Sequence, residues 1–286
     1  MSDSYFFCAI SFLYKRYRII LLERHLISRE HINSTEGSGL FVSKDETISI
    51  MVNEEDHIRL QGMLPGLQLQ NVYEIVDETD NEMEEVLDFA FRPDFGFLTS
   101  SPSNVGTAVK ASVMMHLPAL VYTDQIAKVI NAVAKLGLLA GGFFGEGSDS
   151  LGNFFQISNQ STLGETETQI LLKLTRVVDQ IIAFEKNTRQ RLLEGHKQYI
   201  YDRIGRAYGI MKHAHYLNTR EAFLRLSALR LGVDFKMFTS LDVSKINELL
   251  VLTQSGHLQK YAGKKLDSDE RSLFRAEFVR EKLSLK

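Results

Sequence analysis

The chain has 286 residues, of which 44% are apolar, and its formal net charge at pH 7 is −3. This length allows one large domain or two smaller ones with buried cores, and the near-neutral charge gives no indication of nucleic acid or a membrane surface as an obligate partner. A single cysteine, Cys8, excludes an internal disulfide and a cysteine-rich zinc cluster, which fits a reducing cytoplasm. The eight histidines show no metal-ligand spacing, so no metal site is predicted.

The first third of the chain is predicted to be rich in strands. The apolar runs 5–14 and 17–22 are interpreted as neighbouring buried strands. The first run falls short of the roughly 20 residues that span a bilayer, although the basic residues behind it leave a membrane anchor as an alternative. Residues 29–39 are expected to form a loop, and residues 40–42 and 47–52 to form a hairpin-like pair.

A run of three acids, Glu54, Glu55 and Asp56, follows the second of these strands. Asn53 with Asp56 three residues later predicts the start of a helix, which continues through residues 57–69 and breaks at a Pro-Gly pair. Acids in the first turn of a helix ordinarily satisfy free amides and complement the helix dipole. Alternatively, Glu55 and Arg59 would share one helix face and hold a cationic substrate group, such as a guanidinium, beside a phosphate.

The middle of the chain mixes helices and glycine-rich loops. Residues 74–88 carry eight acids and no Lys or Arg, which predicts a solvated helix face, with attraction of basic polypeptides as the alternative. Residues 95–99 are predicted to form a short strand. The small-residue loop 100–107 then leads into a predicted helix over 108–116, an arrangement in which backbone amides can bind an anion. Residues 123–136 are predicted to form another helix, because their apolar residues recur at helical spacing.

The segment 136–152 contains six glycines, which permit either close approach of the backbone to a ligand or a moving flap. Glu146 lies in this loop and has no evident role in a core. A strand is predicted at 154–158, and the sequence is helical from Gly164 onward. Helices are expected at 165–194, 198–215, 219–231, 243–253 and 268–283, with Gly232 and Gly256 as stop signals.

Four stretches of sequence carry a resemblance. They are Val-Asn-Glu-Glu-Asp-His-Ile-Arg at 52–59, Leu-Thr-Ser-Ser-Pro-Ser-Asn-Val-Gly-Thr at 98–107, Ala-Ser-Val-Met-Met-His-Leu-Pro-Ala-Leu at 111–120, and Gly-Glu-Gly-Ser at 145–148 with Gln-Ile-Ser-Asn-Gln at 156–160. In this order they resemble the ATP:guanido phosphotransferase family, which includes creatine and arginine kinases, and most closely its bacterial protein-arginine kinases. The resemblance extends from about residue 22 to the C-terminus.

This resemblance implies roles for individual residues. Glu55 and Glu146 match the two carboxylates that fix and polarise the guanidinium, and Ser101 and Asn104 lie on the substrate side. The residues implied in ATP binding are His25 near the adenine, Arg59 at the phosphates, and Lys110, Ala111, Ser112, Val113, Met114, Gly141, Gly142, Phe143, Phe144, Gly145 and Glu146. The expected cofactors are ATP and Mg²⁺, the ion being held mainly by phosphates and water rather than by a dedicated set of protein ligands.

The sequence also departs from the family pattern. The family's N-terminal helical domain, with its Ser-x-Arg-x-Arg segment, is not matched. Lys110 and Gly141 stand where the family has arginines, and Ser101 replaces a cysteine near the substrate guanidinium. Lysine keeps the charge but loses the bidentate fork, and glycine supplies neither, so weakened nucleotide binding is expected.

Residues 271–276, Arg-Ser-Leu-Phe-Arg-Ala, resemble the R-D-x-x-R-A motif with which bacterial protein-arginine kinases recognise phosphoarginine away from the active site. Both arginines, Arg271 and Arg275, are present and the aspartate is not. Without the resemblance, the two arginines would be interpreted as an exposed pair four residues apart on a terminal helix.

We therefore expect an α+β fold in which an antiparallel sheet is flanked by helices, with a catalytic domain at 1–194 and a helical C-terminal domain at 195–286. The implied function is ATP-dependent phosphorylation of arginine side chains in proteins. The alternatives are a non-catalytic remnant that binds phosphoarginine or a partner subunit, and, less favoured, a kinase acting on free guanidino compounds. Expected partners are proteins with exposed arginines, a zinc-binding activator protein as in the family, and a second copy of the chain, in the cytoplasm, with neither nucleic acid nor membrane.

Overall fold

The structure is a computed structural model that describes residues 5–34, 36–145, 148 and 150–284. The chain divides into two compact units, and each is described by itself. The first contains Met1–Val113, Leu136–Leu139 and Ser158–Val178, and the second contains Met114–Lys135, Ala140–Ile157 and Asp179–Lys286. Mixed helix and antiparallel sheet make up the described residues, so the predicted α+β class is confirmed.

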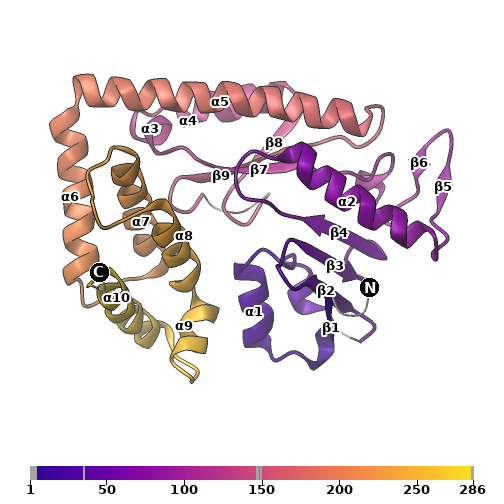
Figure 1. Ribbon diagram of the computed structural model, residues 1–286, viewed down its shortest axis with the longest axis horizontal. Coiled ribbons are helices and arrows are strands. Elements are labelled where there is room, and N and C mark those ends of the chain that lie inside the picture. Colours follow the sequence, from indigo (N-terminus) through magenta and orange to yellow (C-terminus); the bar gives the residue numbers. More distant parts are fainter. Residues whose placement is uncertain (1–4, 35, 146–147, 149, 285–286) are drawn as a thin grey trace. The chain divides into compact units, whose positions relative to one another are not determined.

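The first unit is built on a four-stranded antiparallel sheet of order β1-β2-β3-β4 (Figure 1). Its strands are β1 (Tyr5–Ala9), β2 (Gly39–Ser43), β3 (Ile48–Val52) and β4 (Ile58–Gly62). Leu40 pairs with Met51, and both side chains are fully buried with Ile10 and Ile27 in a small core. The predicted hairpin of residues 40–42 and 47–52 is thereby confirmed.

Helix α2 (Leu69–Glu84) packs against β4, where a glycine makes room for it. A Cβ on Gly62 would lie 2.7 Å from Cγ2 of Val76 and 3.2 Å from Cγ1 of Val72. Most acidic residues of α2 are exposed, as predicted, but Asp80 is half-buried and burial raises its pKa. The first unit also contains α1 (Lys15–Glu23), the small pair β5 (Phe91–Arg92) and β6 (Gly96–Phe97), and 3-10 turns at Ile10–Phe12, His31–Asn33 and Pro102–Asn104.

A three-stranded sheet of order β7-β9-β8 follows, formed by β7 (Ser112–His116), β9 (Phe154–Asn159) and β8 (Leu138–Gly141). Each of these strands has residues in both units, as does the long helix α5 (Glu167–Gly195). Two short helices, α3 (Pro118–Tyr122) and α4 (Ile126–Lys135), connect β7 to β8.

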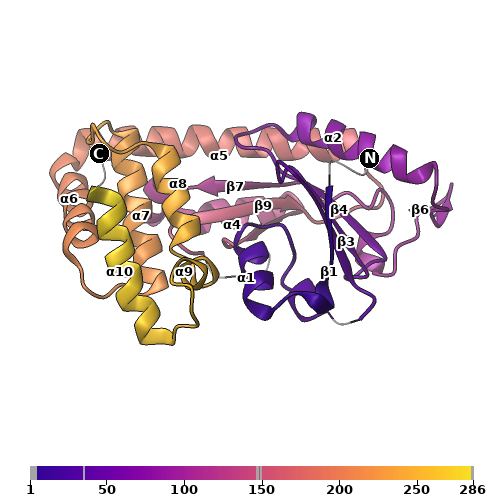
Figure 2. The ribbon, with the colours of Figure 1, turned by 60° about the horizontal axis from the view of Figure 1, so that its bottom comes forward.

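Most of the second unit is helical (Figures 1 and 2). Its remaining helices are α6 (Lys197–His213), α7 (Thr219–Asp234), α8 (Val243–Leu252), α9 (Ser255–Tyr261) and α10 (Ser268–Ser284). Helix α7 is the central element, because it contacts both α6 and α8 and carries fully buried Phe223, Leu226 and Leu229. An Asn218 side chain caps its first turn by accepting a hydrogen bond from the Glu221 N–H.

Two predicted elements near the start of the chain have the wrong type. The run 17–22 is part of helix α1 rather than a strand, and its buried residues Ile20 and Glu23 follow helical spacing. The predicted helix over 53–69 is wrong as well: a turn and then β4 occupy its first half. Asn53 adopts a left-handed φ of 53° and its N–H bonds to the His57 carbonyl at 2.9 Å, so it closes a turn between antiparallel strands instead of capping a helix.

The predicted helix over 108–116 is also wrong, because these residues lead into strand β7. Ala111 and Met115 are buried while Ser112 and Met114 are exposed, which is strand alternation. Pro118 begins helix α3, a position where the missing proline N–H costs nothing. Gly232 and Gly256 lie within α7 and α9, so they are not stop signals, and α9 was not predicted at all.

Candidate active site

The three consecutive acids lie in the turn between β3 and β4. The Ser38 hydroxyl donates to the Asn53 carbonyl at 3.1 Å, and the Asn53 side chain donates to the Gly37 carbonyl at 2.7 Å. These bonds fix the base of the turn to the loop before β2. Because the turn is not helical, Glu55 and Arg59 do not share a helix face, and the three acids have three different environments.

Glu54 points inward, with 1% of its side chain exposed. Its carboxylate lies 3.2 Å from Nη1 of Arg59 and accepts the Glu55 N–H at 2.8 Å. Burial disfavours the charged form, but hydrogen bonds from Ser28 and the Glu55 backbone and the charge of Arg59 outweigh it and lower the pKa of Glu54. An ionised Glu54 therefore orients the Arg59 guanidinium, whose side chain remains 41% exposed.

Glu55 points outward and is exposed. Among the described residues, its carboxylate has no hydrogen-bond partner, so it can accept bonds from a ligand without first breaking others. Its backbone is fixed, since its N–H is bound by Glu54. The exposed Glu55 carboxylate can accept hydrogen bonds from a cationic group of a ligand, and the oriented Arg59 guanidinium can donate to a phosphate of the same complex.

Asp56 joins this turn to the segment 98–107. One carboxylate oxygen accepts the Ser101 N–H at 2.9 Å and the other accepts the Asn104 side-chain amide at 2.7 Å. The Ser100 hydroxyl lies 3.4 Å from Nδ1 of His57. The structure thus brings together Glu55, Arg59, Ser101 and Asn104, all predicted from the sequence. It does so through Glu54 and Asp56, two acids that were interpreted only as first-turn acids of a helix.

His25 lies just beyond Arg24, the residue that caps the C-terminus of helix α1, and has a left-handed φ of 59°. Its carbonyl accepts a hydrogen bond from Nε2 of Gln61 in β4 at 2.6 Å, which ties this residue to the same sheet as Arg59. Burial lowers the pKa of His25, so the ring is neutral at pH 7. A neutral, partly buried imidazole suits contact with an aromatic base.

Asn159 of β9 holds the residues that precede β7. Its Oδ1 accepts the Ala111 N–H at 2.8 Å, and its Nδ2 donates to the Val109 carbonyl at 2.9 Å. Lys110 and Ser112, on either side of Ala111, are exposed, while Val113 is half-buried. In the second unit, Met114 continues the strand with 38% of its surface exposed.

The glycine-rich segment begins as an ordered turn in the second unit. Gly142 and Gly145 exchange backbone hydrogen bonds of 3.0 and 3.1 Å, and Gly145 has a φ of +93° that favours glycine. Gly141 ends β8, and Phe143 is buried with its ring centroid 5.0 Å from that of Phe223. The Ser148 hydroxyl closes the turn by donating to the Gly145 carbonyl. Glu146 lies outside the described residues.

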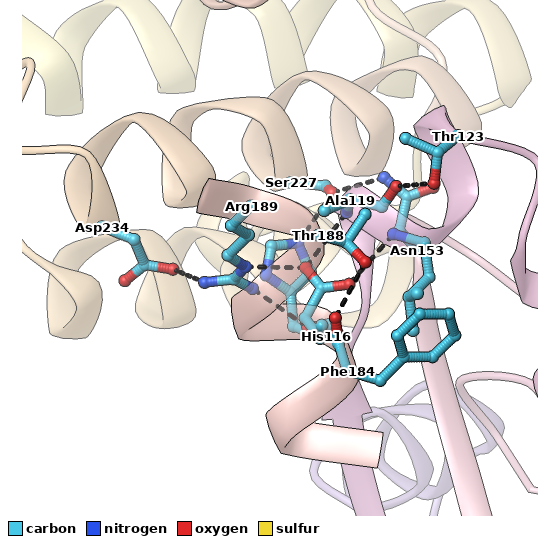
Figure 3. Close-up of polar contacts among 11 residues, drawn as sticks. His116, Ala119, Thr123, Asn153, Phe184, Thr188, Arg189, Ser227 and Asp234 are labelled. Carbon is cyan, nitrogen blue, oxygen red and sulfur yellow. Dashed lines mark hydrogen bonds and ion pairs between the residues drawn. The ribbon is translucent and has the colours of Figure 1, made fainter. Parts of the chain in front are cut away.

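A buried polar network follows β7 (Figure 3). The Glu185 carboxylate accepts the N–H groups of Ala119 and Leu120, both at 3.0 Å, at the start of α3. Arg189 donates to Glu185 at 2.7 Å, to Asp234 at 2.6 Å and to the His116 carbonyl at 3.2 Å. These contacts fix the end of the 111–120 motif from helix α5.

His116 itself completes the network from the other side. Its Nε2 lies 2.8 Å from the Ser227 hydroxyl, which also accepts a bond of 2.8 Å from Asn153 (Figure 3). Burial, with the charges of Arg230 and Arg189, holds the pKa of His116 well below its usual value. Glu185, Arg189, Asn153 and Ser227 were not predicted from the sequence. The one local signal was the spacing of Glu185 and Arg189, an acid and a base four residues apart on a long helix.

The two arginines of residues 271–276 have different surroundings. Arg275 is only 2% exposed and donates to the carbonyls of Thr253 at 2.7 Å and Leu217 at 2.8 Å. Arg271 is half-buried and donates to the Leu266 carbonyl at 2.8 Å. The interpretation of both as an exposed pair is therefore wrong, because Arg275 bonds the carbonyls of the loops before α7 and α9.

The sequence model of the ATP:guanido phosphotransferase C-terminal catalytic domain matches residues 7–188. The chain belongs to the ATP:guanido phosphotransferase family. As a member of this family it is a kinase whose phosphoryl donor is ATP. A second model, the protein-arginine kinase McsB C-terminal domain, matches residues 197–286.

Two curated relatives of this guanido phosphotransferase are named protein-arginine kinase. The protein of Halothermothrix orenii is 46% identical over 94% of this chain and 77% of its own length, and that of Halalkalibacterium halodurans is 46% identical over 93% and 75%. Among solved structures, this chain is similar to the duplicated taurocyamine kinase from Schistosoma mansoni with bound transition-state analogue components. The TM-score is 0.58 and the identity is 28%, and the match covers 64% of this chain and 27% of that one. A lombricine kinase, at TM-score 0.56 and 24% identity over 67% and 55%, supports the fold.

Within the guanido phosphotransferase framework, the roles of the individual residues stay predictions. The described part of the chain contains no helix long and apolar enough to cross a membrane.

Proposed function

We propose that this chain phosphorylates arginine side chains in proteins, with ATP as the phosphoryl donor. The proposal is supported mainly by the different environments of two neighbouring acids in the β3–β4 turn. Glu54 is buried and orients Arg59, whereas the carboxylate of Glu55 is exposed. Both curated relatives described above are named protein-arginine kinase, at 46% identity, which supports protein arginine as the acceptor.

The proposed chemistry follows from these groups. Glu55, together with Glu146, would accept hydrogen bonds from the acceptor guanidinium and receive the proton that its nitrogen loses as the N–P bond forms. Arg59 and Lys110 would neutralise the phosphates, the backbone amides at Gly141–Gly145 would approach them, and neutral His25 would contact the adenine. Catalysis of this kind depends on orientation and charge rather than on a covalent intermediate with the protein.

Mg²⁺ belongs to the proposal as the ion that neutralises the triphosphate. The described residues contain no group of three or more His, Cys, Asp or Glu side chains placed to hold a metal ion. As the family resemblance implies, phosphate oxygens and water would hold most of the ion, and the exposed Glu55 carboxylate could bind its waters.

The test is phosphate transfer from labelled Mg-ATP to an unfolded, arginine-containing protein. We expect acid-labile protein phosphate with the wild type and at least a hundredfold slower transfer with Glu55→Gln, on the order of the effect of losing one charged transition-state contact. Glu82→Gln removes an exposed acid of α2 and should leave the rate unchanged. Wild-type labelling at the level of Glu55→Gln would contradict the proposal and favour a non-catalytic, phosphoarginine-binding role.

Further expectations belong to the same proposal. The catalytic part is assigned to residues 1–194 and the helical part to 195–286. Arg271 and Arg275 are assigned to phosphoarginine recognition. Because Arg275 is buried, it would contribute by holding the surrounding backbone in place and not by contacting the ligand. A zinc-binding activator, a homodimer and a cytoplasmic location follow from the family resemblance.

A further inference from the structure

Asp56 bonds with both carboxylate oxygens to one distant segment of the chain. It accepts the Ser101 N–H and the Asn104 side-chain amide, which are 45 and 48 residues away in the sequence. Asp56 is the neighbour of Glu55, so these two bonds set the distance between the exposed Glu55 carboxylate and residues 101–104. Hydrogen bonds to an ionised group are among the stronger ones in proteins.

The far end of the same segment is fixed independently. The Thr162 hydroxyl lies 3.1 Å from the Ser103 carbonyl and 2.8 Å from the Val105 carbonyl. Gly106 has a φ of +115°, and a Cβ there would lie 2.2 Å from the Thr162 carbonyl oxygen, so the backbone is in close contact. Residues 103–107 are thus anchored without Asp56, whereas the Ser101 amide and the Asn104 side chain depend on it.

The orientation of Asn104 has a chemical consequence. A guanidinium carries five N–H donors and no acceptor, so a site for it needs more acceptors than one carboxylate supplies. Because the Asp56 carboxylate accepts a hydrogen bond from Nδ2 of Asn104, the Oδ1 of this amide faces away from Asp56, where the Ser103 hydroxyl donates to it at 3.5 Å and its second lone pair can accept from a guanidinium. The hydroxyls of Ser101 and Ser103, 2.9 Å apart, provide further acceptors on the same segment.

We propose that Asp56 is a positioning residue for the acceptor arginine: it holds residues 101–104 beside Glu55 so that their oxygens and the Glu55 carboxylate receive one guanidinium together. This inference rests on the proposed function. Asp56 acts here through Asn104 and the Ser101 backbone and not through the nucleotide. A group held in the productive geometry before binding lowers the entropy cost of the transfer.

The experiment compares three variants of the full chain. Asp56→Ala removes both bonds. The double change Asp56→Asn, Asn104→Asp reverses the side-chain pair, since Nδ2 of the new amide can donate to the new carboxylate while its Oδ1 still accepts the Ser101 N–H. Asp45→Ala is the matched control, because Asp45 bonds to Ser43 and Thr47 in the same way at the β2–β3 turn.

For Asp56→Ala we expect the KM for an arginine peptide to rise about tenfold and the KM for ATP to change less than about twofold, as loss of a charged hydrogen bond on the acceptor side implies. Amide hydrogen exchange at Ser101 should accelerate by a similar factor. The reversed pair should restore the slow exchange at Ser101, which depends on the bond from residue 101 to residue 56 alone, and Asp45→Ala should alter neither the exchange nor the peptide KM.

A raised KM for ATP with an unchanged peptide KM would overturn the inference, since Asp56 would then act on the nucleotide and its cation. Unchanged exchange at Ser101 in Asp56→Ala would overturn it as well. If the wild type transfers no phosphate, the proposed function fails separately, and the exchange measurement alone still decides whether Asp56 holds the segment.

Discussion

Neighbouring residues of one type have different functions in this chain because their surroundings differ. Glu54 is buried against Arg59, Glu55 is exposed, and Asp56 is bonded to Ser101 and Asn104. A helical first turn would have given all three acids the same general role. The sequence motif was sufficient to select Glu55 and Arg59, but the partners of the flanking acids are far away in the sequence, and no local pattern reveals them.

His116 gives a prediction at the same scale. Its folded-state pKa lies well below 6.5 because burial and two nearby arginines disfavour the charged ring. Above pH 6.5 the ring is neutral in both states; below it the unfolded chain takes up a proton that the folded chain does not. The free energy of unfolding should therefore fall with pH below about 6.5, by up to about 1.4 kcal/mol per pH unit from this group.

Denaturant titrations of the wild type and His116→Gln between pH 7.5 and 5 provide the check. The difference between the two proteins should shrink as the pH falls, because the variant lacks the proton uptake. A constant difference across this range would show that His116 titrates alike in both states.

At the scale of elements, both the local sequence pattern and the packing against other elements decide whether a segment forms a helix or a strand. Long helices with many apolar repeats, such as α5 and α6, were predicted correctly. Short apolar runs were not: residues 17–22 became a helix and residues 112–116 a strand. Runs of this length fit either period, and packing against neighbours decides between them. Gly232 was also misinterpreted. It lies within α7, where neighbouring side chains leave no room for a Cβ, and it does not end the helix.

Two helix glycines test this explanation. A Cβ on Gly232 would lie 2.5 Å from Phe238 and 2.7 Å from Ile204, whereas one on Gly205 would meet nothing within 4 Å. Gly232→Ala should lower the free energy of unfolding by about 1–3 kcal/mol through overpacking. Gly205→Ala should raise it by about 0.5–1 kcal/mol, since alanine loses less backbone entropy in a helix. Thermal unfolding of both variants measures these changes. Equal shifts of the midpoint temperature in the same direction would contradict the explanation from packing.

For the molecule as a whole, the family resemblance in four short motifs was enough to predict the fold class and the kinase chemistry. The catalytic-domain match over residues 7–188 and the relatives at 46% identity confirm the family. The sequence did not predict the connections that hold the motifs in place: Asp56 to Ser101, Asn159 to Ala111, and Glu185 to Ala119. Each of these pairs joins residues more than 40 positions apart, which only the folded chain brings together.

If a protein arginine receives the phosphate, the residue that carries the phosphate after the reaction must be that arginine. Two peptides, identical except that one contains a single arginine and the other a lysine, would be incubated with the full chain and Mg-ATP and analysed by mass spectrometry at neutral pH. We expect phosphate on the arginine peptide alone, lost on mild acid treatment as an N–P bond requires. Equal modification of the lysine peptide, or acid-stable phosphate on a hydroxyl residue, would contradict this account.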